Sequence, residues 1–428
     1  MAKPSDAGAR AGWRAWFARH ALDLSPLQSP GFRLLYTARL VSVLVYGVLG
    51  VAVAWQVWSL TQSSLKVAGV GLGLALGTIA GLLWGGVIAD RANRRTVMVA
   101  GRAVYVLVVL VLLLNSLQAT PQLGWIYAAT VLSGLAGGIS APALMATLPT
   151  LVPAHQLPAA GALGALAEQL GRLTGPLLAG LLLARGGSSA CYALALAGAV
   201  LTPLLLLRLP ALPAPAPAAA GTAQRVSPWQ AWRESARFAR ASPVVGGLLL
   251  LDILMAVCAT PWVLLPQLGV ETFAGDAQLV GMLHAAPAAG AFLAAATSGW
   301  TRRLDRPGLL LIAAAMGWGL ALLCVGWAAQ PWLALALLVL AGACDTVADI
   351  VRGALLQRHT PDALRGRISA LWLLEMNLAP ALGGLALGGA AQRASAGIAL
   401  AGGGALCALA ALLTGACNRA LRATGWQR

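Results

Sequence analysis

The chain has 428 residues and a formal net charge of +16, yet only 10% of its residues are charged. Hydrophobic residues make up 59% of the chain and its mean hydropathy is +0.79. Because about a quarter of the residues of a soluble globular protein are charged, these values exclude that class and indicate a polytopic membrane protein. The excess of arginine then serves to orient helices beside anionic lipid, and we expect no nucleic-acid partner.

The first 28 residues are predicted to form a cytoplasmic segment with an amphipathic helix at the membrane interface. Arginines alternate there with tryptophan and phenylalanine over residues 10–19. No apolar stretch of the length found in secretory signals occurs in this segment. The mixture is typical of a helix that lies in the interface rather than one that crosses the bilayer.

Twelve apolar runs of about 20 residues follow, and each is long enough to cross the hydrocarbon core. Such segments must be helical because lipid offers no partner to backbone N–H and C=O groups. The sequence therefore predicts an all-α membrane protein with twelve transmembrane helices. We expect these helices near residues 34–60, 67–89, 96–117, 123–148, 158–184, 189–207, 243–269, 277–300, 308–328, 331–357, 368–390 and 396–416.

A proline- and alanine-rich stretch between the sixth and seventh runs divides the chain into two pseudo-symmetric halves. It predicts a linker, followed by a helix that lies on the inner membrane face and tethers the halves. The expected organisation is an N-terminal segment 1–28, a six-helix bundle 29–208, a linker with an amphipathic helix 209–242, a second six-helix bundle 243–418 and a tail 419–428. With the N-terminus inside, 22 of the 29 Lys and Arg residues fall in cytoplasmic segments, which predicts that both termini are cytoplasmic.

The gap between the second and third runs holds an acid and three arginines. The residues that form this pattern are Gly86, Asp90, Arg91, Arg94 and Arg95. An acid that ends one helix and arginines that open the next can hold two helices together at the cytoplasmic surface and part during a change of state. The alternative is a plain cluster of positive-inside charges. The spacing resembles the signature of the major facilitator superfamily, with Asn93 in place of its last glycine.

Other stretches resemble the siderophore-exporting branch of that superfamily, namely residues 29–53, 142–152, 148–163 and 355–372. This resemblance implies a monomeric secondary transporter, without cofactor or resident metal, in the bacterial inner membrane. It implies export of a catecholate siderophore or a similar small amphipathic molecule by alternating access and proton antiport. A multidrug or macrolide efflux transporter is one alternative. A non-transporting membrane sensor or assembly partner is another.

A segment of the fifth run, GRLTGPLLAG, resembles the antiporter motif of proton-driven exporters. Its matching residues are Gly171, Gly175, Pro176 and Gly180. Two of these glycines lie on one helix face, where a neighbouring helix can approach closely, and the proline removes a backbone hydrogen bond. The motif is read either as a packing bend or as a gating hinge. The fourth run lacks the arginine that proton-coupled relatives often carry there, which weighs against proton coupling.

Five carboxylates lie inside apolar runs, where each needs a partner, a cavity or a proton. They are Glu168, Asp252, Asp345, Asp349 and Glu375. At about 1.5 Å per residue, all but Asp349 reach the depth of the bilayer midplane, so we expect four acids from four helices to gather around a polar cavity.

Local spacing separates these acids into paired and unpaired groups. Glu168 precedes Arg172 by four residues and Asp349 precedes Arg352 by three, so each is expected to be paired within its helix. Asp252 and Glu375 have no basic residue nearby along the chain, and they are the first candidates for proton carriers, with Asp345 third. The alternative is that each of these acids only accepts hydrogen bonds inside its bundle.

Aromatic and amide side chains at similar depth are candidates for contact with a ring-rich ligand. They are Trp262, Asn377, Gln169 and His284. Arg39 and Arg102 are expected to extend toward the cytoplasmic surface as anchors. The sequence contains no phosphate-binding loop, no nucleophile motif and no metal-ligand spacing, so we expect no enzymatic activity.

Overall fold

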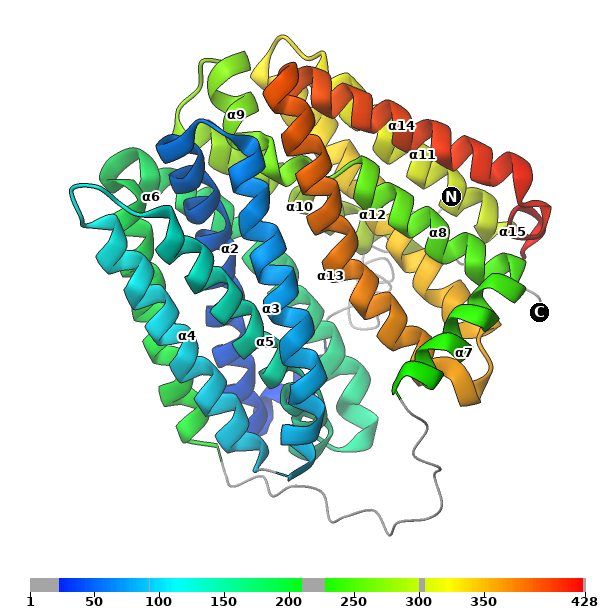
Figure 1. Ribbon diagram of the computed structural model, residues 1–428. Coiled ribbons are helices and arrows are strands. Elements are labelled where there is room, and N and C mark those ends of the chain that lie inside the picture. Colours follow the sequence, from blue (N-terminus) through cyan, green and yellow to red (C-terminus); the bar gives the residue numbers. More distant parts are fainter. Residues whose placement is uncertain (1–22, 92, 210–227, 300–304, 426–428) are drawn as a thin grey trace, which may run out of the picture.

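The computed structural model describes residues 23–91, 93–209, 228–299 and 305–425, and all its regular elements in these ranges are helical. Figure 1 shows two helical bundles side by side, with α2–α6 in one and α8–α14 in the other. The expected interfacial helix before residue 23 lies outside the described residues. The all-α membrane fold predicted from apolar length is confirmed.

The N-terminal bundle consists of five long helices, of which the last crosses the bilayer twice. Their bounds are α2 Pro30–Thr61, α3 Ser64–Arg91, α4 Arg94–Ser116, α5 Leu123–Leu151 and α6 Leu157–Leu207. At about 1.5 Å per residue, the 51 residues of α6 exceed twice the thickness of a hydrocarbon core. The chain breaks within α6 at Gly187, whose φ of 64° and ψ of −166° are open essentially to glycine alone. The fifth and sixth predicted helices therefore meet at this residue.

The C-terminal bundle is preceded by the linker helix α7 Pro228–Ala241. Its long helices are α8 Pro243–Cys258, α10 Ala277–Thr297, α11 Pro307–Gly326, α12 Pro331–His359, α13 Asp362–Arg393 and α14 Ala396–Cys417, followed by the short α15 Arg419–Ala423. Eleven described helices have the length and apolarity to span a membrane. Since α6 counts twice, the predicted twelve crossings are present.

One predicted helix is wrong in its extent. The run 243–269 is not continuous: α8 ends at Cys258, and the chain continues through short turns that include α9 Leu265–Gln267. Thr260, which precedes Pro261, has an extended conformation with φ −104° and ψ 92°. The break follows from proline chemistry, because the ring disfavours a helical conformation in the residue before it and removes one backbone donor.

Helix starts follow the expected capping chemistry. Five described α-helices, α2, α7, α8, α11 and α12, begin with proline, whose missing N–H is harmless in the first turn. The Ser29 and Ser242 hydroxyls accept hydrogen bonds from the first turns of α2 and α8, and the Asp276 carboxylate does so for α10. Asn93 caps α4 through its Oδ1, which accepts from Arg95 N at 2.9 Å. Asn93, which stands where the superfamily pattern has glycine, thus acts as the N-cap of α4.

Glycine determines how closely the helices pack. A Cβ atom built on Gly77 of α3 would lie 2.1 Å from Val131 O of α5. One built on Gly138 of α5 would lie 2.4 Å from Thr78 O of α3. The two backbones therefore meet along a face that no larger residue permits, as is common between membrane helices.

The two bundles contact each other at the end of the molecule that carries the turns 62–63, 273–276 and 394–395, here called the distal end. Gly180 of α6 and Gly281 of α10 are in backbone contact there, because a Cβ on Gly281 would lie 2.7 Å from Gly180 Cα. A Cβ on Gly388 of α13 would likewise lie 2.8 Å from Ser64 O of α3. In Figure 1 this is the end near α9, at the top.

Side-chain hydrogen bonds reinforce the distal contact. Gln392 Nε2 of α13 donates to Ser63 Oγ at 2.6 Å, and Ser64 Oγ of α3 donates to Gln267 Oε1 at 2.6 Å. The linker helix α7 packs on the C-terminal bundle: Phe238 contacts its core, and Glu234 pairs with Arg367 of α13. The predicted amphipathic helix after the linker is therefore present and docked.

Candidate functional site

A cavity of about 680 Å³ lies between the two bundles. Helices α2, α3 and α6 line it from one bundle, and α10, α11 and α12 line it from the other. Most of its wall is apolar. The polar side chains in the wall are Tyr46, Gln169, Arg172, Trp262, His284, Trp318, Asp345, Thr346 and Asp349. A mostly apolar cavity with a few convergent polar groups is the usual form of a small-molecule site.

Three of the four predicted ligand contacts lie in this wall. Gln169, Trp262 and His284 line the cavity, and the Gln169 Oε1 atom is buried without a hydrogen-bond partner among the described residues. His284 Nδ1 lies 2.9 Å from Val280 O, which fixes the ring. The fourth, Asn377, lies outside the cavity wall, and its Nδ2 donates to Leu373 O at 2.8 Å.

The C-terminal bundle holds a charge cluster, consisting of Asp252, Asp345, Asp349, Arg352 and Glu375. Arg352 is 2% exposed and its Nη1 lies 2.5 Å from Asp252 Oδ1 and 2.9 Å from Asp349 Oδ1. The second oxygen of Asp252 accepts a hydrogen bond from Trp372 Nε1 at 2.8 Å. Asp252 is therefore paired across helices, although its own helix carries no basic residue.

The other two acids of the cluster have no ion pair with the arginine. Glu375 is 9% exposed, its Oε1 has no hydrogen-bond partner in the described part of the chain, and it interacts electrostatically with Asp252. Asp345 lines the cavity and interacts electrostatically with Asp349 and with Arg172 from the opposite bundle. Two carboxylates thus pair directly with one buried guanidinium, and two further carboxyl groups lie near enough to interact with it electrostatically.

Glu168 belongs to a separate group in the N-terminal bundle. Its Oε1 lies 3.3 Å from Arg172 Nε, as the four-residue spacing predicted, and its Oε2 lies 3.7 Å from Arg39 Nη2. Glu168 therefore does not belong to the charge cluster around Arg352. The expected gathering of acids occurs for Asp252, Asp345 and Glu375, and Asp349 joins them because it shares the Arg352 guanidinium.

The motif of the fifth helix packs against two partners. The close approach expected at Gly171 and Gly175 is observed: a Cβ on Gly175 would lie 2.7 Å from Gly47 Cα of α2, and one on Gly171 would lie 2.4 Å from Val43 Cγ1. Pro176 lines the cavity, and Gly180 makes the distal contact with the other bundle. One helix face thus serves packing within a bundle and contact between bundles.

The motif after the second helix is described only in part. Gly86, Asp90 and Arg91 are helical at the end of α3, and the side chains of Asp90 and Arg91 lie outside the described part of the structure. Arg95 Nη2 donates to Leu207 O at the end of α6, so this arginine ties two helices of the same bundle together. Arg94 also has an interaction partner.

Sequence reasoning missed Tyr46 and Trp318 as cavity residues and Arg352 as the partner of Asp252. Tyr46 lies on a uniformly apolar helix, so no periodicity marks its cavity-facing side. Trp318 Nε1 donates to Ala259 O at 3.2 Å, a contact created by the break after α8. The described residues contain no group of three or more His, Cys, Asp or Glu side chains arranged to hold a metal ion.

The family model described as "transmembrane secretion effector" matches residues 21–424 of this chain. The chain belongs to this family of the major facilitator superfamily. The match covers both bundles and the linker between them, and it confirms the family predicted from the motifs.

Relatives within the family are similar over most of their length. The enterobactin exporter EntS of Escherichia coli O1:K1 is 37% identical over 370 residues, which cover 86% of this chain and 87% of the relative. The enterobactin exporter EntS of Citrobacter koseri is 36% identical over 372 residues, with the same coverage. The chain is thus a multi-pass membrane transporter and not an enzyme, as expected.

Solved transporter structures share the fold. A peptide transporter of the POT type matches with a TM-score of 0.73 at 12% identity, covering 92% of this chain and 95% of that one. The nucleoside transporter NupG matches with a TM-score of 0.69 at 13% identity, covering 91% and 98%. A D-xylose-proton symporter matches with a TM-score of 0.63 at 17% identity, covering 94% and 98%. At these identities the likeness concerns architecture alone.

Proposed function

We propose that the protein exports a siderophore, or a similar small amphipathic molecule, across the bacterial inner membrane by alternating access. The observation that carries this proposal is the cavity of about 680 Å³ between two bundles, in a chain 37% identical to an enterobactin exporter over most of its length. The bundles 29–208 and 243–418 act as the two moving bodies. The protein works as a monomer embedded in lipid, with both termini cytoplasmic.

In this proposal the distal end faces the periplasm and is closed. The contacts that close it are Gly180–Gly281, Gln392–Ser63 and Ser64–Gln267. The cavity is then loaded from the cytoplasm, and release to the outside requires these contacts to part. Every contact in this set crosses between bundles, which is the property required of a gate.

The charge cluster supports coupling to protons. Four carboxyl groups face one buried guanidinium, so a proton on one acid removes excess negative charge from a region of low dielectric. Glu375 is the member with an unpartnered oxygen, and Asp252 links it to Arg352. We propose these two acids as the proton carriers and Asp345, which lines the cavity, as their connection to the substrate.

The substrate is tested by mass spectrometry of medium and cell extract from an iron-starved deletion strain and its complemented parent. Siderophore retained in the cells and missing from the medium supports export and identifies the compound. An unchanged profile refutes siderophore export. The apolar cavity wall favours a broad efflux transporter as the second candidate, which transport of unrelated lipophilic dyes by reconstituted protein would support.

Proton coupling is tested in proteoliposomes with an imposed pH gradient. We expect Asp252→Asn and Glu375→Gln to abolish accumulation against the gradient while counterflow exchange continues. Asp362→Asn, which removes an exposed acid of α13, is the matched control and should accumulate substrate normally. Normal accumulation by both cluster variants would rule these residues out as proton carriers. Unchanged physiological output from Asp90→Asn and Arg94→Ala would instead favour a non-transporting role.

A further inference from the structure

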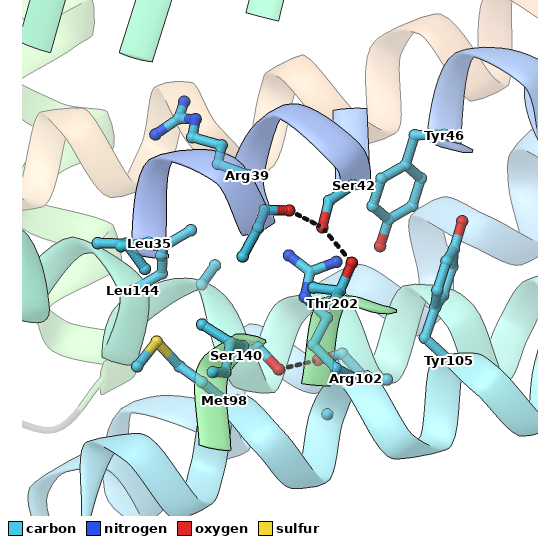
Figure 2. Close-up of a pocket in the computed structure, with 16 residues that line it drawn as sticks. Leu35, Arg39, Ser42, Tyr46, Met98, Arg102, Tyr105, Ser140, Leu144 and Thr202 are labelled. Atoms are coloured by element: carbon cyan, nitrogen blue, oxygen red, sulfur yellow. Dashed lines mark hydrogen bonds between the residues drawn. The ribbon is translucent and has the colours of Figure 1, made fainter. Parts of the chain in front are cut away.

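A second pocket of about 150 Å³ lies inside the N-terminal bundle, between α2, α4, α5 and the second half of α6. It is separate from the central cavity and is here called the side pocket. Figure 2 shows the Tyr46 and Tyr105 rings at one end, the apolar Leu35, Met98 and Leu144 at the other, and the Arg102 side chain between them. A cavity of about this volume in another protein holds a benzene molecule, so the space suits one aryl ring.

The side pocket carries positive charge without an acid in its wall. Its lining includes Arg39 and Arg102 and no Asp or Glu. Arg102 Cζ lies 6.0 Å from the centre of the Tyr46 ring, and Arg102 has no ion pair with any described residue. Arg39 pairs at 3.7 Å with Glu168, which also pairs with Arg172. Two arginines therefore share the Glu168 carboxylate and Arg102 has no carboxylate partner among the described residues, so an anion in the pocket would neutralise excess positive charge.

The aromatic end holds an unsatisfied hydroxyl. The Tyr46 and Tyr105 ring centres are 4.8 Å apart. Tyr105 is 4% exposed, and its Oη has no hydrogen-bond partner in the described part of the chain. A buried hydroxyl left unpaired costs about 1–3 kcal/mol, so a ligand oxygen that pairs with it gains that amount. The hydroxyls of Ser42 and Thr202, 3.4 Å apart, add polar groups to the same wall.

We propose that the side pocket is a binding site for a single anionic aryl group of the hydroxybenzoate class. The ring lies against Tyr46 and Tyr105, the carboxylate or phenolate faces Arg102, and a ring hydroxyl pairs with Tyr105 Oη. The choice of hydroxybenzoate among anionic aryl groups rests on the proposed siderophore export. A phospholipid head group fits less well, because a phosphate makes no use of the paired rings.

The side pocket is connected to the central cavity by shared residues. Tyr46 lines both spaces. The Arg39–Glu168–Arg172 chain of ion pairs runs from the side pocket to the central cavity, since Arg39 lines one and Arg172 the other. The site therefore serves as a cytoplasmic binding step before the central cavity.

The side pocket and the central cavity each have a glycine in the wall that can be replaced by a larger residue without a steric clash. A Cβ on Gly137, in the side-pocket wall, would meet only Tyr46 Oη, at 3.9 Å. A Cβ on Gly50, in the central cavity wall, meets nothing within 4 Å. Gly137→Val therefore fills the side pocket and Gly50→Val narrows the central cavity. The two variants make the same substitution and differ only in which space they reduce.

The test is equilibrium dialysis of radiolabelled 2,3-dihydroxybenzoate against the full-length protein in nanodiscs. We expect saturable binding that weakens about tenfold or more in Arg102→Met and Gly137→Val, and about fivefold in Tyr105→Phe. Tyr127→Phe, whose hydroxyl donates to Lys66 O at the distal end, is the control and should bind normally. The Arg102-dependent component of binding should persist in Gly50→Val, which narrows only the central cavity.

The proposal is overturned by absence of saturable binding, by unchanged binding in Arg102→Met and Gly137→Val, or by loss of binding in Gly50→Val with retention in Gly137→Val. Displacement of the probe by glycerol 3-phosphate at equal concentration would assign the pocket to lipid head groups and also overturn it. Siderophore export is scored separately in the deletion strain. Intact export without probe binding refutes the side pocket alone, and intact binding without export refutes the proposed function alone.

Discussion

Arg352 is predicted to be the ionic residue on which the C-terminal bundle depends most strongly. It is 2% exposed and contacts two carboxylates, at 2.5 Å for Asp252 and 2.9 Å for Asp349. The substitution Arg352→Met keeps an unbranched apolar stem of similar length and removes only the charge and its hydrogen bonds. Asp252, whose side chain is 14% exposed, then keeps the Trp372 indole and the neighbouring Glu375 carboxyl as described polar partners but has no cation to pair with.

The expected loss follows from the desolvation of the charge that remains. Two unit charges about 4 Å apart attract by about 4 kcal/mol at an effective dielectric constant near 20. Removal of one partner from a buried pair costs about 3–5 kcal/mol, because the other charge stays buried without compensation. We therefore expect Arg352→Met to lower the free energy of unfolding by about 3–5 kcal/mol. The double variant Arg352→Met/Asp252→Asn should regain about 1–3 kcal/mol of this loss.

The measurement is unfolding by SDS in mixed micelles, followed by tryptophan fluorescence. Arg365→Met is the matched control: Arg365 lies 2.8 Å from Asp362 with the same three-residue spacing, but both side chains are exposed, at 55% and 86%. Its loss should be about 0–1 kcal/mol. Equal losses in Arg352→Met and Arg365→Met, or no recovery in the double variant, would refute the argument from burial.

Two further predictions also compare a substitution at a residue with a close contact with the same substitution at a residue without one. Tyr192→Phe should lower stability by about 1–3 kcal/mol in the same SDS titration, because its buried hydroxyl donates to Gln56 Oε1 at 2.6 Å, whereas Tyr105→Phe should cost nothing. Equal losses would contradict this. Gly281→Ala should push the distal ends of the bundles apart, because its Cβ would lie 2.7 Å from Gly180 Cα, whereas Gly50→Ala should not. Spin-label distances between Lys66→Cys and Arg393→Cys in a cysteine-free background report the separation, and an unchanged distance in Gly281→Ala would count against a glycine-dependent gate.

The parts of the fold that follow from local physics were predictable. Apolar length places the twelve spans because lipid permits only helices, and the spacings of Glu168 with Arg172 and of Asp349 with Arg352 fix ion pairs that are observed. The break after Cys258 was missed although Pro261 and Pro266 signal it, because hydropathy alone does not register the loss of backbone donors.

The parts that depend on long-range packing were not predictable. Asp252 and Arg352 are a hundred positions apart, so no spacing rule connects them. Asn377 lies on α13, which contributes no residue to the cavity wall, and the sequence of a single helix does not reveal which helices enclose a space. The side pocket depends on four helices at once, so no local pattern shows that Arg39 and Arg102, expected as surface anchors, both line it.

The location of the charges constrains how protonation and transport can be linked. The ion pairs of the C-terminal charge cluster all lie within one bundle, so rocking of the bundles leaves them intact. The distal contacts and the electrostatic interaction of Arg172 with Asp345 cross between bundles, so these change with state. A proton on Glu375 therefore influences the cycle through Asp345 and Asp349, the cluster members that line the cavity opposite Arg172. In the proposed mechanism, substrate and proton compete for the same arginine-facing wall, which is how an antiporter keeps the two from moving together.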